Sequence, residues 1–405
     1  MGLDVARNFE TMMICAAASA SRLPLPELLQ ATTDQVRAQL GGTRPDLAAV
    51  FFTNHFEDEA KEIATTVRAA LQQPQLIGCS GEGVIGPEHE HEHEPALALW
   101  AAHLPLGTTC SIFHSDPEAV AQAAAEQTWS DLLHATPEGQ PGSLLLLADP
   151  FTADITTLLA AVNDRLRGWT IQGGMVSGAE APNQAALIAN NGVFRDGLVG
   201  VALAGGLQVD AVVSQGCRPI GKPYVITKAD RNIVYELGGK KPLELLQQIF
   251  EQGSAADRQL MQRGVLIGRA IKETQAEIRR GDFLVRNLID ADQGSGAIAV
   301  GDLERVGVTV QFQVRDAATA DEDLRALVKG RVEAAPAGAL LFSCNGRGSR
   351  LFAGQKDHDV AVLRELLPGL PVAGFFCAGE LGPIGGANFI HGHTASISFM
   401  RPRTP

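Results

Sequence analysis

LIGCSGEGVIGP, residues 76–87, begins as a buried strand and runs into a glycine-rich turn. An earlier strand, AAVFFT (48–53), is joined to it by a stretch whose apolar residues recur at positions 60, 63, 64, 67 and 71. This spacing places them on one face of a helix. We expect the helix to end near Pro74, because proline breaks a helix. The segment therefore predicts a strand–helix–strand unit, followed by a further strand at Leu97–Leu104.

The same unit recurs twice along the chain. Its second copy runs from a strand at Leu144–Leu147 to TIQGGMVSGAE (170–180). The third copy runs from ALLFSCNGRG (339–348) to PVAGFFCAGELGPIGG (371–386), and a last strand follows at Thr394–Met400. Each copy contains a helical pattern between its two strands.

The spacing within the copies supports a true repeat. Phe52 to Gly78 and Leu147 to Gly173 both span 26 positions, and copies one and three share the related endings GEGVIGP and GELGP. A fixed internal spacing is typical of repeated supersecondary units. The sequence thus predicts an α/β (mixed α+β) fold of repeated strand–helix–strand units, with sheets covered by helices.

A different region, residues 208 to 335, separates copies two and three, and a boundary is expected near 208 to 218. A chain of 405 residues exceeds the size at which one core stops growing, which favours two domains. The region is predicted to hold a helix from Pro242 to about Gln252 and four strands, at Tyr224–Thr227, Val265–Arg269, Phe283–Ile289 and Val308–Val314.

Composition excludes several classes of protein. A formal charge of −13 gives a field that repels phosphate backbones and anionic lipids, so nucleic acid is not an expected partner. The apolar stretch Gly197–Leu207 is about half the length that a spanning helix needs, so no membrane span is predicted. Six scattered cysteines without a CxxC pair indicate reduced thiols and a cytoplasmic location.

The amino-terminal stretch Met12–Ala20 is apolar, as in a signal peptide. However, Asp4 and Glu10 flank it, and only Arg7 supplies the basic region that such a peptide requires. We predict a first strand here.

The segments FSCNGRG (342–348), GFFCAGELGP (374–383) and IGCSGEG (77–83) together resemble FIST domains. The resemblance covers nearly the whole chain, as a FIST N-like domain over 1–210 and a FIST C-like domain over 211–405. It implies a sensory role in intracellular signal transduction, with a small bound ligand. Amino acids are the usual ligands proposed, and haem is proposed for some relatives that respond to nitric oxide. The resemblance implies no catalytic reaction.

The glycine-rich loops are the candidate ligand site, because glycine lets backbone N–H groups approach a ligand closely. Arg347 can clamp a carboxylate through two hydrogen bonds, while Glu380, or Glu82 in the related loop, can receive an ammonium. The pair complements a free amino acid. Alternatively, the loops are only tight turns, and Arg347 and Glu380 pair with each other or cap neighbouring turns. The predicted ligand-binding residues are Cys79, Ser80, Gly81, Glu82, Ser177, Cys344, Asn345, Arg347, Gly348, Cys377, Gly379 and Glu380.

Histidines offer alternative sites. PEHEHEHEP (87–95) would gather three histidines on one side of an extended strand and could bind zinc or nickel, but its composition favours a solvated loop. A haem-binding gas sensor is a second alternative. The sequence has no CxxCH signature, and the candidate axial ligands are His55, His358, His391 and His393.

The remaining expectations concern catalysis and the partner that receives a signal from this protein. Cys344, or Cys377, could act as a nucleophile, but the sequence fixes no base beside either thiol, so we expect no enzyme. A scaffolding subunit is the remaining alternative. No kinase, cyclase or F-box segment is visible, so we expect the response to pass to a separate signalling protein or through a homo-oligomer.

Overall fold

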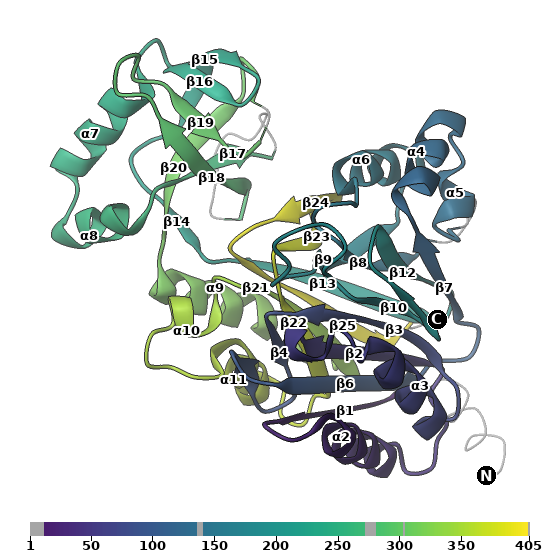
Figure 1. Cartoon of the computed structure of the whole chain (residues 1–405). Coiled ribbons are helices and arrows are strands. Elements are labelled where there is room, and N and C mark those ends of the chain that lie inside the picture. The colour runs from purple at the N-terminus through teal and green to yellow at the C-terminus, as the bar shows by residue number, and fades with distance from the viewer. Residues whose placement is uncertain (1–11, 136–140, 272–280, 303, 404–405) are drawn as a thin grey trace. The chain divides into compact units, whose positions relative to one another are not determined.

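The computed structural model describes residues 12–135, 141–271, 281–302 and 304–403 (Figure 1). Internal contacts divide the chain into two compact units. Unit 1 comprises Met1–Val213, Leu324–Ile390 and Thr394–Pro405, and unit 2 comprises Ser214–Asp323 and His391–His393. The chain enters unit 2 close to the predicted boundary at 210. The two predicted halves are consecutive in sequence, however, whereas unit 1 takes residues from both ends of the chain.

Unit 1 contains the three predicted strand–helix–strand copies, and in each copy the two strands are parallel. Copy 1 is β2 (Leu47–Thr53), α3 (Ala60–Ala70) and β3 (Gln75–Gly81). Copy 2 is β8 (Ser143–Ala148), α6 (Ile155–Arg165) and β9 (Thr170–Met175). Copy 3 is β21 (Gly338–Cys344), α11 (His358–Leu366) and β22 (Val372–Cys377). The predicted mixed α/β repeat is therefore confirmed.

Each copy forms the centre of a six-stranded sheet. The first strand of each copy pairs antiparallel with a later strand, which is β6 (Ala96–His103), β12 (Leu198–Ala204) or β25 (Thr394–Pro402). That strand in turn neighbours the strand that precedes the copy, namely β1 (Ile14–Ser21), β7 (Thr109–Ser115) or β13 (Leu207–Gln215). The three sheets thus share one strand order.

The remaining edge of each sheet is filled by a hairpin from a different copy. The hairpin after β3, formed by β4 (Gly83–Ile85) and β5 (Glu90–Glu92), joins the sheet of copy 3 through β22. The hairpin β10 (Leu187–Ala189) and β11 (Gly192–Phe194) passes from copy 2 to β3 of copy 1. The hairpin β23 (Gly379–Ile384) and β24 (Ala387–His391) passes from copy 3 to β9 of copy 2. This cyclic exchange carries all three glycine-rich loops from one sheet to the next.

The three sheets share one central core on their inner faces. Phe51 of copy 1 stacks on Phe375 of copy 3 at 5.4 Å between ring centroids, and Phe342 meets both rings edge-on. Leu147 of copy 2 belongs to the same buried cluster. Strands buried on both faces read as continuous apolar runs, which is why AAVFFT shows no polar alternation.

Helices cover the outer faces of the three sheets (Figure 1). Copy 1 is covered by α2 (Leu25–Leu40) and α3. Copy 2 is covered by α4 (Pro117–Glu126), α5 (Trp129–Leu132) and α6. Copy 3 is covered by α11 and by α9 (Ala317–Lys329).

One glycine in each copy lets the two parallel strands approach each other closely. Gly78, Gly173 and Gly374 lie opposite the first strand of their copies, at matching register positions. A Cβ atom at these positions would lie 2.4, 1.9 and 1.7 Å from the facing carbonyl oxygens of Val50, Leu146 and Leu341. No side chain fits such a gap, so close approach of the strands requires glycine.

Unit 2 is a closed six-stranded barrel with two helices packed on it. Its strands run in the order β20 (Thr309–Arg315), β15 (Tyr224–Asp230), β16 (Ile233–Leu237), β19 (Ile298–Val300), β18 (Phe283–Ala291) and β17 (Leu266–Ala270). A pairing of β17 with β20 closes the ring, and β14 (Cys217–Pro219) adds to β20. The helices are α7 (Pro242–Gln252) and α8 (Ala255–Arg263).

The strands and the helix predicted for this region coincide with barrel elements, whereas closure of the barrel was not predicted. Within the described ranges, no helix is long and apolar enough to cross a membrane. None of the six cysteines forms a disulfide among the described residues.

Candidate functional site

The glycine-rich loops of the three copies meet at one place in unit 1. Ser177, in the loop of copy 2, accepts a hydrogen bond at its Oγ from the Glu82 backbone N–H of copy 1, at 2.9 Å. The same hydroxyl donates to the Phe376 carbonyl of copy 3. In copy 3, the Asn345 N–H donates to the Cys377 carbonyl at 2.8 Å. The structure thus brings together predicted residues that are up to 295 positions apart in the sequence.

Two charged side chains mark this meeting point. Glu82 forms an ion pair with Arg350, whose side chain is 47% exposed, against 27% for that of Glu82. Arg350 also donates to the Asn345 carbonyl at 2.8 Å, and the Asn345 amide lies 3.4 Å from the Glu82 carboxylate. We call Glu82, Ser177, Asn345, Arg350 and Phe376 the loop junction.

Arg347 does not face the loop junction as a free cation. Its guanidinium is fully buried and makes two hydrogen bonds to the Asp359 carboxylate, at 2.8 and 2.7 Å. Ser343 and His358 bond the same carboxylate at 2.8 and 2.9 Å. Burial alone would raise the pKa of Asp359, but the adjoining Arg347 holds it well below its usual range. Arg347, which was predicted to bind a ligand carboxylate, therefore binds the carboxylate of Asp359 instead.

Glu380 is also buried and bonded within the protein. Its Oε2 accepts hydrogen bonds from the Thr394 N–H and hydroxyl, at 3.1 and 2.7 Å. It pairs with Thr394 of the adjacent strand rather than with Arg347, so the predicted alternative of an Arg347–Glu380 pair is wrong. The strands β23 and β25 belong to different sheets but are in contact, which brings Thr394 to Glu380.

The remaining predicted residues pack the loops together. Cys79 and Cys377 are fully buried, and burial raises the pKa of each thiol well above its ordinary value. Ser80 accepts a hydrogen bond from the Ala186 N–H at 3.0 Å. The Cys344 thiol lies 3.9 Å from the Asn345 side-chain oxygen.

The three remaining glycines make close contacts. A Cβ on Gly81 would lie 3.1 Å from the Phe375 ring. A Cβ on Gly379 would lie 3.2 Å from Ile390. Gly348 has a φ of +52°, and a Cβ there would lie 2.7 Å from the carboxylate of Glu92.

The histidine-rich run is not a solvated loop, as its composition had suggested. Glu90–Glu92 forms strand β5, and the Glu90 side chain accepts hydrogen bonds from the first-turn N–H groups of α11 at Asp359 and Val360, at 2.8 and 3.0 Å. Glu92 accepts the Ser349 N–H and hydroxyl, both at 2.9 Å. Alternating glutamate side chains therefore cap two helices of copy 3 from the exchanged hairpin.

Two histidines of this run, His89 and His91, contact neighbouring side chains. His91 contacts Glu94 at 2.9 Å through Nδ1 and the Ser19 hydroxyl at 3.0 Å through Nε2. His89 lies 3.2 Å from Asp357. Among the residues that the structure describes, no group of three or more His, Cys, Asp or Glu side chains is arranged to hold a metal ion.

Two of the candidate haem ligands, His358 and His393, are held by neighbouring side chains. His358 stacks on Phe352, with 3.4 Å between ring centroids, and bonds Asp359 through Nδ1. The Nε2 of His393 bonds Asn287 at 3.0 Å, and burial lowers the pKa of His393 to about 4. His55 bonds Thr53 at 3.1 Å, and His391 is buried. The surroundings of His358 and His393 do not fit axial haem ligands.

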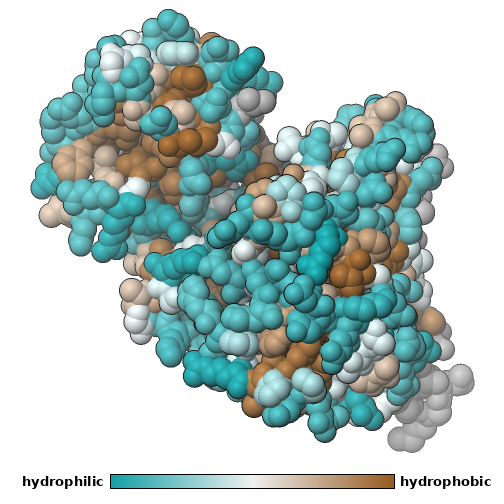
Figure 2. Space-filling model, viewed as in Figure 1, coloured by the Kyte–Doolittle hydropathy of each residue, from teal (hydrophilic) through white to brown (hydrophobic). Residues whose placement is uncertain are grey.

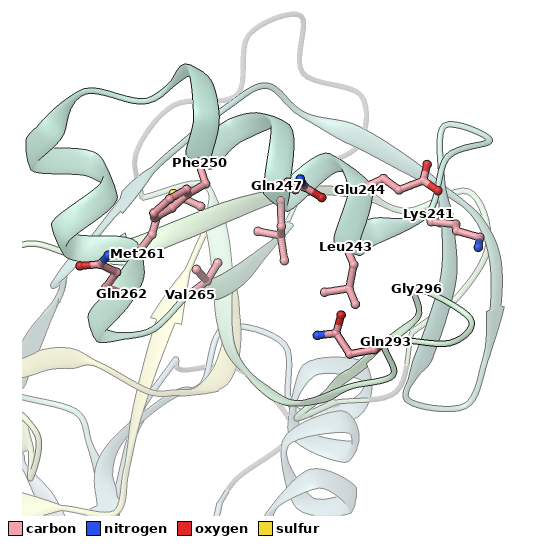
Figure 3. Close-up of a pocket in the computed structure, with 11 residues that line it drawn as sticks. Lys241, Leu243, Glu244, Gln247, Phe250, Met261, Gln262, Val265, Gln293 and Gly296 are labelled. Atoms are coloured by element: carbon pink, nitrogen blue, oxygen red, sulfur yellow. The ribbon is translucent and has the colours of Figure 1, made fainter.

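Three cavities bear on ligand binding. The first, at the loop junction, is a space of only about 10 Å³ that is lined in part by Glu82, Asn345, Arg350 and Phe376. The second has a volume of about 440 Å³ and shares the lining residues Glu92 and His93 with the first. A third cavity of about 520 Å³ lies in unit 2, between α7, α8 and the loop after β18 (Figure 3). This third cavity could not be predicted from the sequence, because its walls come from segments without a motif.

Comparison with known proteins identifies the family. A FIST N domain model matches residues 46–240, and a FIST C domain model matches residues 242–383. A protein of Mycobacterium tuberculosis, named as uncharacterized, is 42% identical over 373 residues, which are 90% of this chain and 93% of that protein. A similarly named Mycobacterium bovis protein is 40% identical over 387 residues, 93% of this chain and 96% of its own length.

A cyanuric acid hydrolase from A. caulinodans aligns over 97% of this chain and 100% of its own, at 11% identity and a TM-score of 0.30, which is too low to carry an argument. The two domain models together span most of the sequence and include all three glycine-rich loops. This chain belongs to the FIST family, with a FIST N domain followed by a FIST C domain.

Proposed function

We propose that this protein is a cytoplasmic sensor that binds a small zwitterion, such as a free amino acid, at the loop junction. FIST domains are sensory domains of signal transduction. The observation that carries the proposal is the partly exposed Glu82–Arg350 ion pair at the point where the three glycine-rich loops converge. The proposal retains an arginine for the ligand carboxylate and a glutamate for its ammonium group, but the arginine is Arg350 instead of the predicted Arg347.

The ion pair matches the two charges of an amino acid. Arg350 can bind an α-carboxylate through two parallel hydrogen bonds, and Glu82 can accept an α-ammonium. An exposed ion pair contributes at most about 1 kcal/mol to stability. A ligand that separates Glu82 from Arg350 and binds both side chains therefore sacrifices little free energy. The Asn345 amide lies beside both groups and can add a hydrogen bond.

The small volume at the loop junction requires the pair to open. Only about 10 Å³ is free between Glu82, Arg350 and Phe376, which is room for no more than a water molecule. Arg350 lies on α10 (Gly348–Leu351), which Glu92 caps from the exchanged hairpin β4–β5. Ligand entry would therefore favour a conformation in which Arg350 has moved, and such a shift in population is a signal that a partner can read.

We propose binding rather than catalysis. Burial raises the pKa of the Cys377 thiol well above its ordinary value, which makes this thiol a poor nucleophile and supports binding over an enzyme that uses Cys377. The convergence of charged groups on loops also favours a sensor over a purely scaffolding subunit. The signal would pass to a separate signalling protein or through a homo-oligomer.

Isothermal titration of the full chain with each of the common amino acids tests the proposal. We expect at least one to bind, with affinity reduced tenfold or more by Glu82→Gln and by Arg350→Gln. Arg325→Gln is the matched control, because Arg325 forms a comparable surface ion pair with Glu365 at 2.7 Å. The proposal fails if no amino acid binds, or if both variants bind as the wild type does.

A further inference from the structure

The cavity of unit 2 has the size and lining of a small-molecule site (Figure 3). Its volume of about 520 Å³ lies in the usual range of ligand pockets, roughly 300–1,000 Å³. Its apolar lining comes from both helices and from the residue before β17, and consists of Leu243, Leu246, Phe250, Met261 and Val265. Polar groups surround this lining, as they do in most ligand sites.

Helix α7 carries more apolar surface than the barrel core uses. Leu245 packs into the core and is 2% exposed. A second set of apolar side chains lies on the neighbouring edge of the helix, at Leu243, Leu246 and Phe250. These residues are three and four positions apart, and each is only partly buried. Apolar side chains gather on this face of unit 2 beside the helices (Figure 2). A ligand that covers this edge would remove apolar surface from water, which favours binding.

The walls of the cavity are held in place before any ligand binds. Ser254 and Asp257 form a capping box at the start of α8. Asp257 also accepts a hydrogen bond from Arg218 at 2.6 Å, and Arg218 bonds Asp316 at 3.1 Å. Preformed walls reduce the entropy cost of binding.

The loop that forms the third wall is fixed in the same way. The Asp292 carboxylate accepts the N–H groups of Gly294 and Ser295, at 3.0 and 3.1 Å. The Gly296 carbonyl accepts the Leu243 N–H of α7 at 3.2 Å. The loop is therefore tied both to itself and to the helix opposite.

Lys241 supplies an exposed cation at one end of the cavity. Its stem packs on Gly296, where a Cβ atom would lie 2.9 Å from the lysine Cδ. Within the described part of the chain, no hydrogen bond or ion pair is recorded for the Lys241 ammonium or the Gln293 amide. Figure 3 shows the Gln293 amide directed towards Leu243 and the cavity. Both side chains are exposed, so a carboxylate at this end can accept hydrogen bonds from them without breaking a contact within the protein.

From this arrangement we propose that the cavity binds a small carboxylate with an apolar body. The carboxylate binds at Lys241 and Gln293, and the apolar body lies over Leu246, Phe250 and Met261. Glu244, one turn along α7 from Lys241, opposes the negative charge and limits affinity. This second site lies in unit 2 and uses no residue of the loop junction.

Octanoate is the probe for this site, with octanol as its uncharged analogue. In the full chain labelled with [methyl-13C]methionine, we expect octanoate to shift the Met261 methyl resonance saturably, with Met261→Leu identifying the signal. Lys241→Gln should weaken octanoate binding at least tenfold and leave octanol binding unchanged. Glu244→Gln should strengthen octanoate binding several-fold. Lys240→Gln, at the exposed neighbouring lysine, is the control and should have no effect.

Two results would overturn the proposal. One is the absence of any saturable Met261 shift with octanoate. The other is binding of octanoate that Lys241→Gln does not weaken. Arg350→Gln should leave octanoate binding intact, so failure of this site and failure of the loop junction are distinguishable.

Discussion

Arg347 and Asp359 form a fully buried ion pair in which the guanidinium Nε and Nη2 donate to the two carboxylate oxygens at 2.8 and 2.7 Å. Arg347 lies just after β21, and Asp359 lies in the first turn of α11. The pair therefore ties the strand end of copy 3 to its own helix. Arg347 therefore stabilises the fold, whereas Arg350, three residues later, reaches the surface.

Removal of Arg347 should destabilise the protein strongly. Arg347→Met leaves the Asp359 carboxylate buried without its cation, and breaking a buried pair in this way costs about 3–5 kcal/mol. Arg325→Met breaks a surface pair and should cost about 1 kcal/mol or less. Urea unfolding of both variants measures the difference. Equal losses would show that the buried pair has no special structural role.

Glu90 should make stability depend on pH. Burial, and then the charge of Asp359, raises the pKa of Glu90 from 4.5 to about 8. Arg347 and Glu92 are the other charged groups that interact with this cluster. Because the folded protein then holds a proton that the unfolded chain releases, the free energy of unfolding should fall as pH rises from about 4.5 to about 8.

The variant Glu90→Gln tests this prediction. Glutamine keeps the side-chain oxygen that caps α11 and cannot ionise, so its stability relative to wild type should grow across that pH window and level off above it. Urea unfolding at pH 5, 7 and 9 provides the measurement, with the exposed Glu365→Gln as control. A constant difference between variant and wild type would mean that Glu90 is already ionised at pH 5.

Gly374 should tolerate no side chain. A Cβ there would lie 1.7 Å from the Leu341 carbonyl oxygen, so Gly374→Ala must separate β21 from β22. We expect a loss of at least about 3 kcal/mol, at the upper end of the cost of overpacking. Gly392→Ala enters open space and is the control. Soluble yield and thermal unfolding report the outcome, and wild-type stability of Gly374→Ala would refute the close approach.

The repeat could be predicted from sequence because its signals are local. Each copy shows a buried apolar run, a helical pattern and a glycine that faces the first strand. The length of chain between the facing residues is not fixed, because it is 28 positions from Val50 to Gly78, 27 from Leu146 to Gly173 and 33 from Leu341 to Gly374. The hairpin exchange could not be predicted in this way. It depends on which sheet edge β4 and β5 pair with, and β22 lies almost 300 residues further along the chain.

The candidate site was predicted in location and only partly in detail. The glycine loops identified Glu82 and Asn345, which lie at the loop junction, but not Arg350, because only the folded chain shows which arginine of GRGSR is buried. Glu90 has the composition of a solvated loop and is buried, because the exchanged hairpin places it against α11. Burial of this kind is a tertiary property that local sequence does not encode.

Native mass spectrometry of the full chain with an equimolar mixture of amino acids tests the loop junction most directly. The account predicts one added mass per chain, equal to a single amino acid, lost in both Glu82→Gln and Arg350→Gln and retained in Arg325→Gln. An unliganded wild-type chain, or an added mass that survives both loop-junction substitutions, would contradict it.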